Sequence, residues 1–334
     1  MYAAMDHVTT AYDLGSDSGS GSGSGSWTIE PVTRGALGRI WKMSGPSGDW
    51  AVKEMLFGCD EHQVRREAAL RDASEALGIT SPRLLKNSEG AHVTRLPPHL
   101  GGSCLKLYDW VDGTGADPTA PEILAWVGRT LALLHTAGAG ATEAPSAWHD
   151  TCPTASEWQA LHQKTAGSGL PWSDELADFP DRATEFSRHV TPAADRTDLV
   201  TSHLDVQPQN VLVGRDGPVL IDWDNAGSTT PGRELAWVVY AWSGRNRPNL
   251  DAARQLVRAY VAAGGPGTIR TLNAFSMLLA TSLNYIQVQA EAALDPTRTP
   301  DERAFADDQV RTSLSALPDL PTLSLLIKEL APEW

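Results

Sequence analysis

Cysteine and long apolar runs are both scarce in this chain of 334 residues. Its three cysteines, Cys59, Cys104 and Cys152, lie far apart without the spacing of a metal site, which predicts reduced thiols and a cytoplasmic location. No stretch of the sequence approaches the roughly 20 apolar residues that cross a bilayer, and the first residues lack the basic-then-apolar order of a signal peptide. We therefore expect no membrane partner.

Positive charge is also in deficit, because 27 Lys and Arg face 41 Asp and Glu, for a net charge of −14. Such a surface repels nucleic acid and anionic lipid, so we expect no nucleic-acid partner. It favours a cationic small molecule as ligand. The composition leaves the oligomeric state open, and a hydrophobic content of 41% is ordinary for a globular protein.

The N-terminal region is marked by alternating glycine and serine over residues 15–26. This is the composition of a flexible linker, with no side chains to bury. It predicts that residues 1–26 form a disordered Gly/Ser-rich tail outside the fold, either natural or added.

The remaining sequence changes its periodicity along the chain. Alternating apolar and polar residues over 27–57, interrupted by Gly45–Gly48, predict a set of hairpins. Residues 60–77 predict a helix that ends at Gly78, and helical spacing dominates from Pro121 onwards. The chain therefore combines a β-rich first part with a helical second part.

The most informative segment runs from His203 to Asp222. It offers a carboxylate at Asp205, an amide at Asn210 and a second carboxylate at Asp222, directly after an apolar run. A phosphotransferase needs this set, because one carboxylate accepts a hydroxyl proton while an amide and another carboxylate hold magnesium against nucleotide phosphates. The order His-x-Asp-x-x-x-x-Asn, an apolar strand, then Asp is shared by protein kinases and related small-molecule kinases.

Four segments together resemble the aminoglycoside phosphotransferase and choline kinase-like family. They are Trp50–Lys53, Glu67, His203–Asn210 and Ile221–Asp224. The resemblance implies an α+β, protein-kinase-like fold with two lobes. A small β-rich N-lobe over 27–108 would bind nucleotide, and a larger helical C-lobe over 109–334 would carry catalysis and the acceptor. Gln-Pro-x-Asn and Asp-Trp-Asp suit this branch better than the protein kinases.

The resemblance also implies roles for the residues of the catalytic segment. Asp205 would be the catalytic base, and Asn210 and Asp222 the ligands of Mg²⁺. His203 either supports this loop through hydrogen bonds or is simply a buried, satisfied histidine. Asp224 has two possible roles. It either contributes to the metal site through a water molecule, or to the substrate site, or it caps the following loop.

Nucleotide binding is expected from three places in the first part of the chain. Lys53 would pair with the α- and β-phosphates and be held by Glu67 from the predicted helix, the alternative being a solvated lysine. A phosphate-covering loop would contain Gly35 and Gly38, although an ordinary turn fits them too. The connector between lobes, which would contact adenine, is the third place. It contains Asp109 and Val111.

Acceptor residues are the least determined by the sequence. Glu234 stands where the family more often has Asp, and either braces the catalytic loop or accepts a substrate amine. Asn284, Gln287 and Glu291 share one face of a predicted helix, which either lines the acceptor site or is solvated.

The function implied is transfer of the γ-phosphoryl group from ATP, or GTP, to a small-molecule hydroxyl with Mg²⁺ as cofactor. The first choice of acceptor is an aminoglycoside or amino sugar. The alternatives are another metabolite, such as choline, homoserine or a free sugar, and a non-catalytic nucleotide-binding protein.

Overall fold

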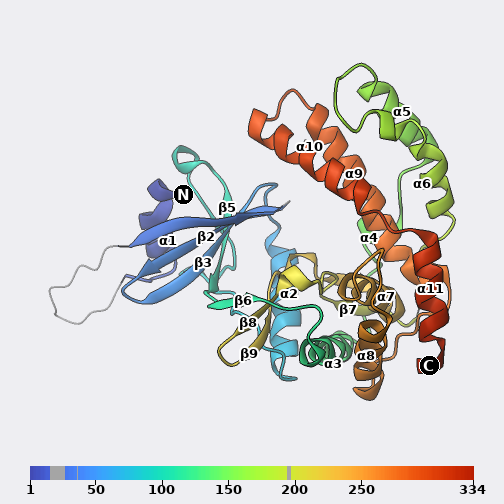
Figure 1. The fold of residues 1–334 in the computed structure, drawn as a ribbon. Coiled ribbons are helices and arrows are strands. Elements are labelled where there is room, and N and C mark those ends of the chain that lie inside the picture. The colour runs from blue at the N-terminus through green and yellow to red at the C-terminus, as the bar shows by residue number, and fades with distance from the viewer. Residues whose placement is uncertain (16–26, 36, 194–196) are drawn as a thin grey trace. The chain divides into compact units, whose positions relative to one another are not determined.

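The chain forms two compact units in a computed structural model that describes residues 1–15, 27–35, 37–193 and 197–334. The first unit comprises Met1–Ala116 and Gln209–Ala226, and the second comprises Asp117–Pro208 and Gly227–Trp334. Figure 1 labels the helices and many of the strands of the two units. The sequence predicted a single boundary after residue 108, whereas the chain re-enters the first unit at Gln209.

A five-stranded antiparallel sheet in the order β1-β2-β3-β5-β4 forms the centre of the first unit. Figure 1 labels β2, β3 and β5 of this sheet. Its strands are β1 (Thr28–Arg34), β2 (Gly38–Gly45), β3 (Gly48–Met55), β4 (Thr94–Arg95) and β5 (Cys104–Asp109). The tight turn between β2 and β3 depends on Gly48, whose φ of +130° suits glycine alone. The hairpins predicted over 27–57 are therefore confirmed.

Alternation along the strands gives this sheet two different faces. Val52 of β3 and Leu105 and Leu107 of β5 point to an apolar cluster. Lys53 pairs with Lys106 across the β3–β5 ladder, so both lysines point to the opposite face. Helix α2 (Glu61–Glu75), capped by the Asp60 side chain, contacts that second face.

The N-terminal residues correct the prediction that 1–26 lie outside the fold. A short 3-10 turn, η1 (Tyr2–Ala4), leads into helix α1 (Met5–Ala11). Ala4, Val8 and Tyr12 are buried in the apolar cluster of the sheet. Their four-residue spacing places them on one helical face, which the adjoining Gly/Ser composition obscured. Of the predicted tail, 16–26 lie outside the described residues.

A second small sheet explains why 209–226 belongs to the first unit. It has the order β6-β8-β9, formed by β6 (Gly113–Gly115), β8 (Val211–Gly214) and β9 (Gly217–Leu220). The backbone N–H of Leu220 also donates to the carbonyl of Thr80, 3.0 Å away. Two short 3-10 turns, η4 (Pro208–Asn210) and η5 (Trp223–Asn225), precede and follow this hairpin.

The second unit is largely helical and contains a two-stranded ladder, β7 (Val200–Ser202) with β10 (Gly227–Thr229). Its helices are α3 (Pro121–Ala137), α4 (Ala147–Asp150), α5 (Ala155–Thr165), α6 (Phe179–Ser187), α7 (Pro231–Trp242), α8 (Leu250–Ala262), α9 (Ser276–Leu294), α10 (Pro300–Ser315) and α11 (Leu320–Leu330). Every residue of α7 except Gly232 is buried. Helices α3 and α8 pack closely at Gly128, where an added Cβ would lie 2.3 Å from the Leu256 carbonyl oxygen. None of the helices within the described ranges is both long and apolar enough to cross a membrane.

Candidate active site

The candidate catalytic loop follows β7 in the second unit. His203 and Leu204 are buried, and Asp205 is half-buried. Leu204 has a φ of +60°, a backbone conformation that a leucine rarely adopts. Strain of this kind persists only where the surrounding structure imposes it, and it concentrates at functional sites.

A chain of buried hydrogen bonds anchors this loop. The N–H of Gly267 donates to the Tyr260 hydroxyl over 2.7 Å, and that hydroxyl forms a second hydrogen bond with Nδ1 of His135, 2.8 Å away. The Glu234 carboxylate can only accept, so Nε2 of His135 carries a proton and donates to it over 2.9 Å. The other carboxylate oxygen of Glu234 accepts from the N–H of Leu204 over 2.7 Å.

Glu234 is consequently a bracing residue, and its side chain is only 1% exposed. Burial by itself would raise its pKa, but the hydrogen bonds from His135, Ser202 and the Leu204 N–H outweigh burial and lower the pKa. Of the two alternatives for Glu234, the substrate-amine role does not fit this burial. His135, in the last turn of α3, is the group that joins this helix to Glu234.

The side chain of Asp205 is oriented by its immediate neighbours. The Gln207 amide donates to Oδ1 of Asp205. Gln207 is held in turn by the Arg245 guanidinium at 3.3 Å, and the Trp242 indole N–H donates to the Val206 carbonyl over 2.9 Å. These contacts hold the Asp205 carboxylate and the loop backbone next to it.

The candidate metal ligands lie together in the first unit. Val211 pairs with Leu220 in the β8–β9 hairpin, and the N–H of Ile221 donates to the Asn210 carbonyl over 3.0 Å. The hairpin thus brings Asn210 and Asp222 to its same end, although 12 positions separate them in the chain. Asp222 has a φ of +64°, a second strained position.

The chemistry of these two side chains fits a hard divalent cation, because both offer oxygen ligands. Asn210 is buried, whereas the side chain of Asp222 is 38% exposed. The described residues contain no cluster of three or more His, Cys, Asp or Glu side chains that could hold a metal ion by itself.

Lys53 is buried between two carboxylates of the first unit. Its Nζ lies 2.6 Å from Oδ1 of Asp222 and 2.7 Å from Oδ2 of Asp224. Burial by itself would lower the pKa of Lys53, but Asp224 and Asp222 outweigh burial and raise the pKa. Lys53 thus remains a cation, as a phosphate ligand must.

Glu67 does not hold Lys53 as predicted. Its carboxylate pairs instead with Lys106, whose Nζ lies 2.9 Å from Glu67 Oε2 and 2.5 Å from Asp224 Oδ1. The physical reason is the β3–β5 register, which points a second lysine to the face that α2 covers. Burial and the Asp224 charge raise the pKa of Glu67 to about 7, although Lys106 opposes them.

Lys106 is a site residue that sequence reasoning missed. In Leu105-Lys106-Leu107 the alternation predicts an outward lysine, yet its side chain is 1% exposed. Burial would lower its pKa, while Tyr108, Asp224 and Glu67 raise it. Asp224 is 4% exposed and bridges both lysines, so the loop-capping alternative and a direct substrate contact do not fit its position.

The other expected nucleotide residues also lie in the first unit. The N–H of Gly35 donates to the Gly38 carbonyl over 2.9 Å in the turn between β1 and β2. An added Cβ at Gly38 would lie 2.8 Å from the Glu54 carbonyl and 3.4 Å from Cε of Lys53, so this turn needs glycine beside the lysine. The Asp109 carboxylate forms a bidentate pair with Arg83. Val111 is half-buried in the segment after β5.

The helix-face residues expected at the acceptor site lie on α9. The Asn284 amide donates to the carbonyls of Trp148 and Thr151, at 2.9 and 2.7 Å, and so fastens the end of α4. Glu291 is exposed and accepts from Gln287 over 3.4 Å. The structure therefore engages Asn284 with backbone groups and leaves Glu291 at the surface.

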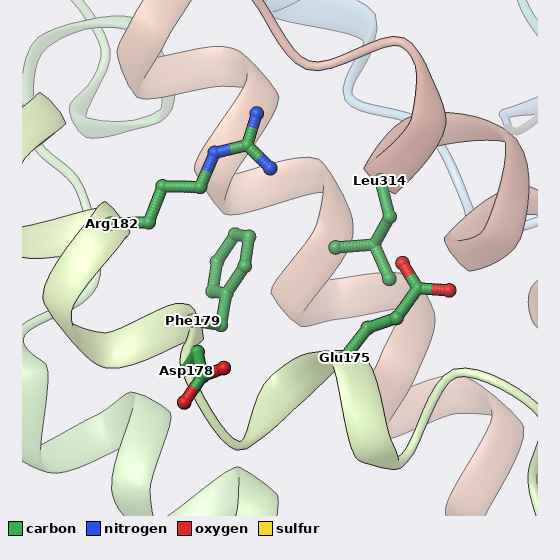
Figure 2. Close-up of a pocket in the computed structure, with 5 residues that line it drawn as sticks. All are labelled: Glu175, Asp178, Phe179, Arg182 and Leu314. Atoms are coloured by element: carbon green, nitrogen blue, oxygen red, sulfur yellow. The ribbon is translucent and has the colours of Figure 1, made fainter.

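A pocket of about 230 Å³ lies elsewhere in the second unit (Figure 2). It is lined by Glu175, Asp178, Phe179, Arg182 and Leu314. These residues come from η3 (Asp174–Leu176), the start of α6 and the end of α10. None of them is among the site residues that the sequence indicated.

The fold described above is of the protein-kinase-like class. The model of the phosphotransferase enzyme family, APH, matches residues 28–271, and the chain belongs to this family. Comparison with curated protein sequences finds no match. The predicted α+β fold and family are confirmed.

Solved structures show the same fold at low sequence identity. An aminoglycoside phosphotransferase from Alicyclobacillus acidocaldarius is 18% identical with a TM-score of 0.57, over 98% of this chain and 95% of its own. A spectinomycin phosphotransferase in complex with ADP and spectinomycin is 14% identical with a TM-score of 0.62, over 90% and 93%. An amicoumacin kinase in complex with AMP-PNP and Ca²⁺ is 12% identical with a TM-score of 0.56, over 95% and 94%.

Proposed function

We propose that this protein transfers the γ-phosphoryl group of ATP, or GTP, to a hydroxyl of a small molecule in a Mg²⁺-dependent reaction. The observation that carries the proposal is the group formed by Lys53, Asp222 and Asn210 in the first unit. It combines a buried cation with two oxygen ligands, which is what a metal-bound triphosphate requires.

Nucleotide binding is assigned to the first unit. Lys53 would bind the α- and β-phosphates, and Gly38 permits the β1–β2 turn to lie close to that lysine. A Mg²⁺ ion held by Asn210 and Asp222 would neutralise charge on the phosphates when bound. In the structure Lys53 pairs with Asp222. On binding, the nucleotide phosphates would take the place of Asp222 at Lys53, and the metal would take the place of Lys53 at Asp222.

Proton transfer is assigned to Asp205. In a loose phosphoryl transfer the hydroxyl keeps its proton until late, so the carboxylate mainly orients the hydroxyl and then accepts the proton. Glu234 and Gln207 hold the loop and the carboxylate in place for this step. His203 supports the loop from its buried position.

The first-choice acceptor is an aminoglycoside or amino sugar. Two comparisons support it, because their structures are of an aminoglycoside phosphotransferase and of a spectinomycin phosphotransferase. The net charge of −14 favours a cationic acceptor by long-range attraction. A cytoplasmic location would supply both the nucleotide and Mg²⁺.

An ADP-release assay of the purified protein tests the proposal. The panel is aminoglycosides, amino sugars, choline, homoserine and free sugars, each with ATP and with GTP, and products are identified by mass spectrometry. Asp205→Ala is the inactive comparison, and Asp216→Ala, at an exposed turn, is the matched control. Nucleotide binding without acceptor-dependent ADP release from any compound would favour the non-catalytic alternative. Release with choline but no amino sugar would change the acceptor and keep the reaction.

A further inference from the structure

The carboxylate of Asp224 is shared between two buried lysines. Its Oδ2 lies 2.7 Å from Lys53 Nζ, and its Oδ1 lies 2.5 Å from Lys106 Nζ. Lys106 also pairs with Glu67 at 2.9 Å. The contacts run in one line, Glu67–Lys106–Asp224–Lys53, and join α2, β5, η5 and β3.

We propose that Asp224, rather than Glu67, positions Lys53 for the nucleotide phosphates, and that Lys106 with Glu67 fixes Asp224. Asp224 and Lys106 are then positioning residues for the phosphate-binding lysine. This inference rests on the proposed function, because it assigns Lys53 to a nucleotide. The anion that orients Lys53 is then Asp224 of η5, which follows the metal ligand Asp222, and not Glu67 of α2.

Exposure separates the two carboxylates that contact Lys53. Asp222 is 38% exposed, whereas Asp224 is 4% exposed. A bound metal ion would engage the accessible Asp222, and Lys53 would then keep Asp224 as its fixed anion. Asp224 is therefore suited to hold the ammonium both before and after a nucleotide binds.

Lys106 is not placed to serve as a phosphate ligand, because its side chain is 1% exposed and forms ion pairs with two protein carboxylates, Glu67 and Asp224. Its place opposite Lys53 in the β3–β5 ladder explains its effect. Without Lys106, the buried carboxylates of Glu67 and Asp224 would lie close together with only Lys53 to offset them. An uncompensated buried charge is strongly destabilising, so the ion pair with Lys106 holds the Asp224 carboxylate in place.

Nucleotide titration with and without Mg²⁺ tests the assignment independently of any acceptor. We expect Asp224→Asn to weaken ADP binding about tenfold to a similar extent in both conditions, because Lys53 contacts phosphate whether or not a metal is present. Glu67→Gln should weaken binding no more than about threefold, since it acts through Lys106. Asp216→Asn, in the exposed turn of the β8–β9 hairpin, is the matched control and should bind as the wild type does.

A loss confined to the Mg²⁺ condition would make Asp224 a metal-side group and overturn the inference. The inference would also be overturned if Asp224→Asn bound ADP within about twofold of the wild type. The same holds if Glu67→Gln lost as much ADP affinity as Lys53→Met does. If Asp224→Asn does not fold, the double variant Lys106→Met/Glu67→Gln is measured instead. It removes the pair that supports Asp224, and it removes one buried positive and one buried negative charge together. That folded double variant should bind ADP at least about fivefold more weakly, and unchanged binding would overturn the inference. A wild-type protein that binds no nucleotide would instead defeat the proposed function.

Discussion

Glu234 accepts a hydrogen bond over 2.7 Å from the backbone N–H of Leu204, the residue directly before Asp205. The same carboxylate receives the imidazole N–H of His135 at 2.9 Å. Both partners are donors, and each of the two carboxylate oxygens accepts one of these bonds. The orientation of the candidate base thus depends on a residue of α7 that is itself fully buried.

Glu234→Gln should slow phosphoryl transfer about tenfold or more and leave nucleotide affinity unchanged. The amide NH₂ would face one of the two donors, at a cost of about 1–3 kcal/mol in folding free energy. Steady-state kinetics, nucleotide titration and denaturant unfolding measure the three effects. Glu185→Gln, on the exposed side of α6, is the matched control. Wild-type turnover together with wild-type stability would show that Glu234 does not brace the loop.

Asp205→Ala should abolish transfer while nucleotide affinity stays near that of the wild type. A general base contributes at least about a hundredfold in rate, and the residues assigned to the nucleotide lie elsewhere in the chain. Turnover and nucleotide titration are the measurements. Turnover within about tenfold of the wild type would remove Asp205 from the mechanism.

Asp222→Asn should weaken Mg²⁺-nucleotide binding more than it weakens binding of the metal-free nucleotide. A carboxylate supplies charge to the cation that an amide cannot. Calorimetry with and without Mg²⁺ distinguishes the two losses. Equal losses in both conditions would place Asp222 outside the metal shell.

Deleting residues 1–15 should lower the melting temperature by several degrees, because it uncovers the apolar face of the five-stranded sheet. Val8→Asp should act in the same direction, since it buries a charge without a partner. Ala3→Asp, at an exposed position of the same segment, is the matched control. An unchanged melting temperature for both the deletion and Val8→Asp would show that α1 does not stabilise the sheet in solution.

The stability of the protein should fall between pH 6.5 and 4 in part because of His149. Burial lowers the pKa of His149 to about 4, although Glu234 and Asp150 oppose the shift. An unfolded histidine has its ordinary pKa near 6.5, so across this range the unfolded chain binds a proton that the folded chain does not. The loss in unfolding free energy should reach about 3 kcal/mol at pH 4.

Denaturant unfolding at a series of pH values, on wild type and His149→Gln, measures this contribution. The variant should show a shallower fall with decreasing pH, and Gln keeps a polar group near the Thr281 hydroxyl that His149 contacts at 3.0 Å. His62→Gln, at an exposed position of α2, should retain the wild-type slope. Parallel curves for wild type and His149→Gln would contradict the prediction.

The pattern of apolar and polar residues was enough to predict the hairpins over 27–57, helix α2 and the helical second part. Repeats of two residues for strands and 3.6 for helices depend only on residues that are near one another in the chain. Asp205, Asn210 and Asp222 could be singled out in the same way, since they lie within one loop and one hairpin. Their roles remain predictions, but their places in the structure follow from short-range chain geometry. The protein-kinase-like fold was predicted from these motifs as well.

What only the tertiary structure decided is which groups far apart in the chain meet. Lys106 meets Glu67 and Asp224 because the β3–β5 register points it toward α2, and periodicity alone describes it as an outward lysine. Tyr260 reaches Glu234 through His135 because α3 packs on α8. Helix α1 covers the sheet although a glycine–serine composition follows it. Each pairing depends on packing between separate elements. It is selected by the free energy of burying charge or apolar surface, and neighbouring residues in the sequence do not determine that free energy.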